Sequence, residues 1–351
     1  MAALDEAVRR NPPPEEIASL RLELLALDEN WPQVAIEAEA RLTTVPDDGH
    51  TLELLARAHL QQYQCATATT TARRWRDAAP DNPDAITTWG LLAEDAASLC
   101  EAGAQLCAIA QTGDDVQLGM ALIRDGDWPV AACVLTRAAA EDAASSEARA
   151  WLGEALAQIG HPAEARPHFL KAVALAPESP LPWLLLGIHD LRQQQTGSAM
   201  DALLRAHTLD PTNPAPCLAL AEVKAQAGDY DEVDMWITAA LNIAPTDAEI
   251  AKAAAHFYLE RHLIQEEYPI RAIQSAIQLA PDDGEARMLL GWFRLMTEDS
   301  AGARAALNEA VTLSPNLGQA HYLRGQALQA TGDREAAQSA FIRAADLGYR
   351  P

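Results

Sequence analysis

Small and apolar residues recur with a fixed period in the middle of the chain, between residues 148 and 245. One set of small residues and one set of prolines each recur at the same constant interval: Gly153, Gly187 and Ala221, and Pro177, Pro211 and Pro245. A constant period of about 34 residues is typical of a repeat array in which every unit is one supersecondary motif. Each period is therefore expected to be one structural unit.

The spacing inside each unit predicts two helices. With the small residue numbered 8 and the proline 32, apolar or small residues fall at positions 4, 7, 8 and 11 and again at 20, 24, 27 and 28, which is helical spacing. Gly228-Asp229 and Gly332-Asp333 stand between the two helices. Glycine suits the left-handed residue that ends a helix, and aspartate accepts the free amides that begin the next one. Because the proline ends the second helix, each unit is expected to be a pair of amphipathic helices, A and B.

This unit resembles the tetratricopeptide repeat (TPR) family. The resemblance rests on small residues at positions 8, 20 and 27, large apolar or aromatic residues at 7 and 24, and proline at 32; Phe169 and Phe341 take position 24. It implies an all-α, right-handed superhelical solenoid of about ten TPR-like helix-turn-helix repeats. It is specific for the fold and unspecific for function.

The register is interrupted in the first third of the chain. Gly90 and Gly119 lie closer together than one full period, and Trp75 occupies position 27, where a small residue is usual. We therefore expect an N-terminal TPR-like arm at residues 1–111, with an irregular third unit, and a regular TPR array of seven units at residues 112–351. The short unit is expected to change the angle between its neighbours.

Composition narrows the class of partner. The chain has 351 residues and a net charge of −24, with lysine only at positions 171, 224 and 252. A nucleic-acid surface needs clustered basic residues, so no nucleic-acid partner is expected. The acidic balance favours either plain solubility or a groove that attracts a basic partner. Because no apolar run is long enough for a signal peptide or a membrane span, we expect no direct membrane insertion and a cytoplasmic location, with a removed export signal left open.

The cysteines and the catalytic motifs add little chemistry. Five cysteines stand in helical patterns without a CxxC pair, and are expected to be small buried hydrophobes in a reducing compartment: Cys65, Cys100, Cys107, Cys133 and Cys217. The sequence has no phosphate-binding GxxxxGK loop, no GxSxG and no HExxH. We expect a protein that is not an enzyme, with no cofactor and no metal.

A stacked array of helix pairs has an extended concave surface that can bind a ligand. In the resembled family, helix A positions 2, 5, 9, 12 and 13 line the concave groove, and lysine and asparagine pairs or an asparagine ladder mark known peptide classes; neither set occurs here. Apolar residues instead form two groups at these positions: Leu181, Leu184, Ile188 and Leu191, and Met288, Trp292, Leu295 and Met296. Glu154, Glu222 and His256 are polar residues at position 9. Exposed apolar groups of this kind mark contact surfaces, unless neighbouring units bury them.

These patterns predict a non-catalytic scaffold or adaptor that binds a segment of a partner protein in its concave groove, within a multiprotein assembly. The segment is expected to be extended or helical, apolar and basic in character. The alternative is a structural subunit that self-assembles through uncapped array ends as a homo-oligomer, because no polar helix follows the last repeat pattern. If the chain formed oligomers in a concentration-dependent way without any partner, that result would favour the second hypothesis over the first.

Overall fold

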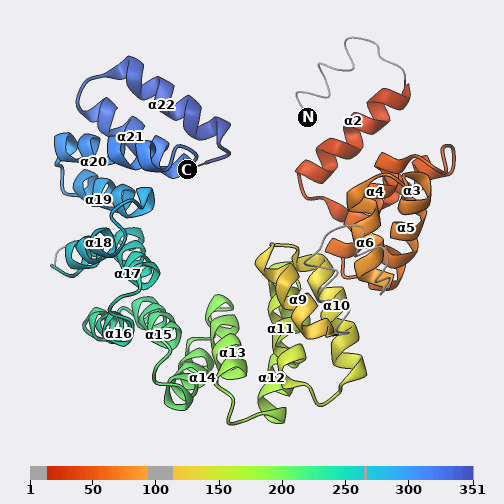
Figure 1. The fold of residues 1–351 in the computed structure, drawn as a ribbon, viewed down its shortest axis with the longest axis horizontal. Coiled ribbons are helices and arrows are strands. Elements are labelled where there is room, and N and C mark those ends of the chain that lie inside the picture. The colour runs from red at the N-terminus through yellow and green to blue at the C-terminus, as the bar shows by residue number, and fades with distance from the viewer. Residues whose placement is uncertain (1–13, 94–113, 265–266, 351) are drawn as a thin grey trace. The chain divides into compact units, whose positions relative to one another are not determined.

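The computed structural model describes residues 14–93, 114–264 and 267–350, and every regular element in these ranges is an α-helix (Figure 1). The chain divides into two compact units, Met1–Gln193 and Gln194–Pro351. None of the described helices is both long and apolar enough to cross a bilayer. The predicted boundary between residues 111 and 112 falls outside the described residues, so the predicted two-part organisation stays a prediction.

The first unit contains helices A and B of the N-terminal repeats. Its described helices are α2 (Pro14–Leu27), α3 (Trp31–Leu42), α4 (Gly49–Gln61), α5 (Cys65–Ala78), α6 (Pro83–Ala93), α9 (Asp115–Arg124), α10 (Trp128–Glu141), α11 (Ser146–Gln158), α12 (Pro162–Leu175) and α13 (Pro180–Arg192). Consecutive helices such as α4 and α5, or α11 and α12, pack directly against each other. Cys100 and Cys107, and the predicted second helix of the short unit, lie outside the described residues.

The second unit continues with the same helix pairs. Its helices are α14 (Thr196–Leu209), α15 (Ala215–Ala227), α16 (Tyr230–Ile243), α17 (Ala248–Glu260), α18 (Tyr268–Leu279), α19 (Gly284–Met296), α20 (Ser300–Leu313), α21 (Gly318–Ala330) and α22 (Arg334–Asp346). Pro269 stands in the first turn of α18 and supplies a φ angle suited to that position. In both units the buried residues fall on the small and apolar positions of the register.

The small residue at position 8 lets the two helices of a unit approach closely. A Cβ atom added to Gly153 would lie 2.8 Å from the ring of Phe169, and one added to Gly325 would lie 2.5 Å from the ring of Phe341. Neither distance is possible for a real side chain, so the aromatic ring at position 24 fills the space that glycine leaves. This contact explains why the two positions are coupled in the sequence.

The turn between helices A and B places one residue in the left-handed region in unit after unit. Gly228 has φ 77°, and the non-glycine residues Tyr63 and Gln194 take φ 55° and 59° at the same register position. The predicted role of aspartate after this residue is confirmed for Asp333, which accepts a hydrogen bond from the amide of Ala336. It is wrong for Asp229, which makes no capping bond and lies 3.7 Å from Lys224 Nζ instead.

A disulfide joins Cys65 at the start of α5 to Cys133 in α10, with the two Cα atoms 5.5 Å apart. Beside it, the hydroxyl groups of Tyr63 and Thr136 are 2.5 Å apart. Repeats of a regular solenoid contact only their neighbours, yet these contacts connect the second repeat to the fourth. The expectation of unpaired cysteines is therefore wrong for Cys65 and Cys133, because α10 packs against α4 and α6 and so lies beside the start of α5. It is confirmed for Cys217, which is free and buried.

Candidate functional site

The first predicted groove surface lies on α13, in the first unit, and we call its residues Leu181, Leu184, Ile188 and Leu191 the α13 face. Leu184 and Ile188 are half-buried, whereas Leu191 is only 7% exposed. The expectation that nothing covers this face is therefore corrected for Leu191, whose side chain belongs to the core. The other three residues keep apolar surface available to a ligand.

Glu154 lies in α11, which packs against α13. The residue is 6% exposed, and its Oε1 accepts hydrogen bonds from Arg192 Nη1 at 2.9 Å and Gln158 Nε2 at 2.7 Å. Its Oε2 is buried without a hydrogen-bond partner among the described residues. A buried carboxylate oxygen without a partner costs free energy, so this atom would gain from a donor that a ligand brings.

Behind Glu154 the helices are held by buried groups that the sequence did not single out. Asp190 is 1% exposed and accepts two hydrogen bonds from the guanidinium of Arg166, at 3.0 and 3.3 Å. His189 is also 1% exposed and packs its ring 5.1 Å from that of Phe169. Burial lowers the pKa of His189, since water no longer stabilises its charged form. These groups keep α12 and α13 in fixed positions.

The second predicted surface lies on α19, and Met288, Trp292, Leu295 and Met296 form the α19 face. Met288 is only 1% exposed, so the expectation that it lines an open groove is corrected: it is a core residue. Trp292, Leu295 and Met296 are half-buried and pack against the same core. The ring of His256 stands edge-on to Trp292, with the ring centres 6.1 Å apart. The α19 face therefore offers less open apolar surface than the sequence predicts.

The polar residues at position 9 link the A helices of neighbouring repeats. Glu222 forms an ion pair with Arg261, as Glu154 does with Arg192. His256 Nε2 lies 3.0 Å from Glu285 Oε1. All three predicted polar site residues are thus engaged within the array, although one oxygen of Glu154 is not.

Lys252, at position 5 of α17, has become part of a buried ion cluster. Its Nζ lies 2.7 Å from Asp283, 2.7 Å from Glu285 and 2.9 Å from Glu249. Burial opposes charge on Lys252, Asp283 and Glu285, but the hydrogen bonds among them outweigh it, raising the pKa of Lys252 and lowering those of Asp283 and Glu285. Carboxyl groups with depressed pKa values stabilise the fold above their unfolded pKa and lose that effect as the pH falls through the folded pKa.

Replacing Lys252 with methionine is therefore expected to destabilise the second unit by about 1–3 kcal/mol at pH 7, less than for a fully buried pair because the carboxylates are partly exposed. Without the ammonium group, the pKa values of Asp283 and Glu285 rise toward their unfolded values. The variant is therefore expected to lose less stability than the wild type when the pH falls below about 4. Thermal melts followed by circular dichroism between pH 3 and 7 measure both effects. Lys171→Met, at an exposed position of α12, is the matched control and should change neither.

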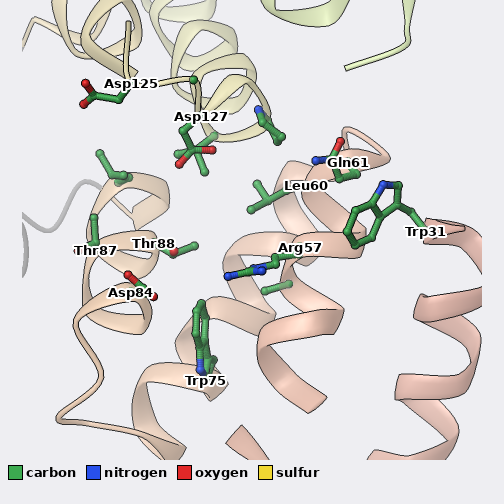
Figure 2. Close-up of a pocket in the computed structure, with 15 residues that line it drawn as sticks. Trp31, Arg57, Leu60, Gln61, Trp75, Asp84, Thr87, Thr88, Asp125 and Asp127 are labelled. Carbon is green, nitrogen blue, oxygen red and sulfur yellow. The ribbon is translucent and has the colours of Figure 1, made fainter. Parts of the chain in front are cut away.

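A third candidate surface was missed by the sequence analysis. A cleft of about 510 Å³ in the first unit lies between α4, α5 and α6 on one side and the α9–α10 turn on the other, and we call it the N-terminal cleft (Figure 2). Its polar lining includes Arg57, Asp84, Thr87, Asp125 and Asp127, and its aromatic lining is Trp31 and Trp75. In Figure 2, Asp84 and Asp127 lie on opposite sides of the hollow, whereas the side chain of Asp125 points away from it, and all three residues are exposed.

The sequence did contain a signal for this cleft. Arg57, Leu60 and Gln61 occupy positions 9, 12 and 13 of the second repeat, and Asp84 and Thr87 occupy positions 2 and 5 of the third. These are the groove positions used for the later repeats. The contribution of the α9–α10 turn had no such signal, because this turn belongs to the fourth repeat, which is not a neighbour of the second along the chain.

Among the described residues, no three histidine, cysteine, aspartate or glutamate side chains converge in a way that could hold a metal ion.

Models of the tetratricopeptide repeat match residues 116–180, 158–214 and 270–317, residues 190–257, and residues 318–347. No curated protein sequence matches the chain significantly.

Two solved structures align with the chain, and the first of them has a similar fold. A tetratricopeptide repeat protein from Parabacteroides merdae ATCC 43184 aligns with 16% identity and a TM-score of 0.51, covering 68% of this chain and 93% of that one. Yeast Tom70 aligns with 12% identity and a TM-score of 0.47, covering 95% of this chain and 92% of that one. At these identities the similarity concerns the fold alone. Together with the all-helical elements, the family matches confirm the predicted all-α repeat fold.

Proposed function

Because the chain belongs to the tetratricopeptide repeat family, whose members generally bind other proteins, we propose that it is a non-catalytic scaffold that holds a segment of a partner protein against its A helices. The segment carries apolar side chains for the α13 face and a basic or amide group for Glu154. The α19 face is a second contact surface, through Trp292, Leu295 and Met296.

The observation that carries this proposal is that Leu184 and Ile188 are half-buried apolar residues of α13, which packs against α11, the helix that carries Glu154. The Oε2 atom of Glu154 is buried and has no donor among the described residues. Apolar anchors with a few placed polar groups are typical of binding sites. A net charge of −24 further favours a segment with basic residues.

The test is a pull-down from the native cell with three variants. Ile188→Asp and Trp292→Ala are expected to reduce the recovered partner by about tenfold, because each removes apolar contact at the surface. Leu313→Asp, at a 40% exposed position of α20, is the control and should bind like the wild type. Melting temperatures of all variants separate lost binding from lost folding.

The proposal would be contradicted if the two variants, Ile188→Asp and Trp292→Ala, recovered the same partners as the wild type. The self-assembly alternative makes a different prediction, because it requires no partner. Light scattering of the purified chain across a hundredfold concentration range would then show growing oligomers whose size is unaffected by either substitution.

The compartment is also proposed rather than shown. Disulfides form and persist in oxidising compartments, so the bond between Cys65 and Cys133 removes the argument for a reducing cytoplasm. An oxidising compartment is therefore the better proposal for the working location of this chain. Alkylation of thiols in intact cells before lysis, followed by mass spectrometry, would test it.

A further inference from the structure

The N-terminal cleft is held open by contacts that connect its two sides. Cys65 closely follows Gln61, the last cleft residue of α4, and Cys133 lies one helical turn after Pro129 of the other side. The disulfide therefore joins the two sides directly. Arg137 of α10 adds a hydrogen bond from Nη1 to the carbonyl of Leu91 at 3.2 Å. A cleft fixed in this way is preorganised for a ligand.

The charge that lines the cleft is unbalanced. Asp84, Asp125 and Asp127 contribute three carboxylates, and no side chain of the described residues forms an ion pair with them. Arg57 is the cation of the lining, and its Nη2 is paired with Glu53 on its own helix at 2.7 Å. The three carboxylates outnumber the one cation of the lining, so the cleft carries a net negative charge that Arg57 compensates only in part.

Asp127 shows the effect of that arrangement most clearly. It stands at the start of α10, open to solvent at the mouth, but the surrounding walls displace enough water to raise its pKa. The amide of Val130 and the positive charge of Arg57 act in the opposite direction and do not cancel the effect. A second cation beside this carboxylate would stabilise its charged form.

Two indole rings complete the chemistry of the cleft. Trp75 is 3% exposed and rises from α5 at the base of the hollow, while Trp31 stands half-buried at one side (Figure 2). Trp75 is too buried to present its ring face to a ligand, so Trp31 is the indole available to a cation. A guanidinium group can stack on an indole while it bonds carboxylates in its plane. An ammonium group lacks the planar fork needed for both contacts together.

We propose that the N-terminal cleft binds the side chain of an arginine presented by a segment of a partner protein. The proposal rests on the proposed scaffold function, and it adds a second recognition point with its own chemistry. The guanidinium lies between Asp84 and Asp127, and its methylene groups lie along the cleft. Arginine is preferred to lysine by its two-carboxylate geometry.

The test uses the blocked tripeptide acetyl-Gly-Arg-Gly-amide as the probe and the full chain with its disulfide intact. Indole N–H resonances of Trp31 and Trp75, the former assigned with Trp31→Phe, are followed by NMR as peptide is added. Saturable shifts of these two resonances are expected. The same peptide with citrulline, which is neutral and nearly isosteric, is expected to bind at least about tenfold more weakly, as for loss of a charge-assisted hydrogen bond.

Matched variants localise the effect. Asp127→Asn and Asp84→Asn are each expected to weaken the arginine peptide about tenfold, whereas Asp282→Asn, exposed in the loop before α19, leaves it unchanged. Equal binding of the citrulline peptide, equal loss in all three variants, or an absence of saturable shifts would each overturn the proposal. The pull-down variants lie on α13 and α19, so failure of either experiment leaves the other result standing.

Discussion

Replacement of Phe169 with alanine is expected to lower the free energy of unfolding by about 3–5 kcal/mol, the range for a large aromatic residue removed from a packed core. The side chain is fully buried, it fills the space left by Gly153, and its ring lies 5.1 Å from that of His189. One ring thus connects α11, α12 and α13. Urea unfolding followed by circular dichroism measures the loss.

The neighbouring residue provides the control. Leu170 is 45% exposed on the same helix, and its replacement by alanine is expected to change stability by less than about 1 kcal/mol. Since repeat arrays need not unfold in one step, hydrogen exchange should show the loss concentrated in α11–α13. Equal stability of the Phe169→Ala and Leu170→Ala proteins would contradict the packing argument.

The same contact has a consequence for binding. Gly153 precedes Glu154, and His189 follows Ile188, so the ring of Phe169 supports the backbone on which both groove residues stand. A Phe169→Ala protein is therefore expected to lose partner binding together with stability, whereas Ile188→Asp loses binding alone.

Most of the fold was predictable because each repeat is a local motif. Helix spacing, glycine at position 8 and proline at 32 all act within a single repeat unit, and stacking follows from burying the apolar face of each pair. The prediction failed where contacts span more than one unit. Nothing near Cys65 or Cys133 in the sequence indicates that the two would meet, because they belong to repeats that are not neighbours along the chain.

The candidate groove residues were harder to predict, since a register position gives a direction but not an exposed area. Leu184 and Met288 both occupy position 5 of helix A, yet Leu184 is half-buried and Met288 is 1% exposed. Position 5 of α19 is covered by residues of the same core cluster, which includes Leu259 and Leu323 from neighbouring repeats. Burial of this kind depends on side-chain packing between repeats and has no signature in the spacing.

Removal of the disulfide is the second change with a large expected effect. The bond closes a segment of 68 residues, and the Cys65→Ala/Cys133→Ala protein is expected to lose about 2–4 kcal/mol because its unfolded chain gains conformational freedom. Dithiothreitol should bring the wild-type protein to the stability of this variant. Identical urea transitions of the oxidised wild type and the double variant would show that the bond contributes nothing.

The location of the loss is more informative than its size. In a repeat array, stability is close to a sum of units and their interfaces, so amides of α4, α5 and α10 should lose exchange protection while those of α19–α22 keep it. Cys217→Ala changes a free cysteine of the second unit. It should lower exchange protection in that unit and leave the protection of α4, α5 and α10 unchanged. If the disulfide holds the N-terminal cleft together, the reduced protein must also bind the arginine peptide more weakly, because ordering the two sides then costs free energy at the moment of binding.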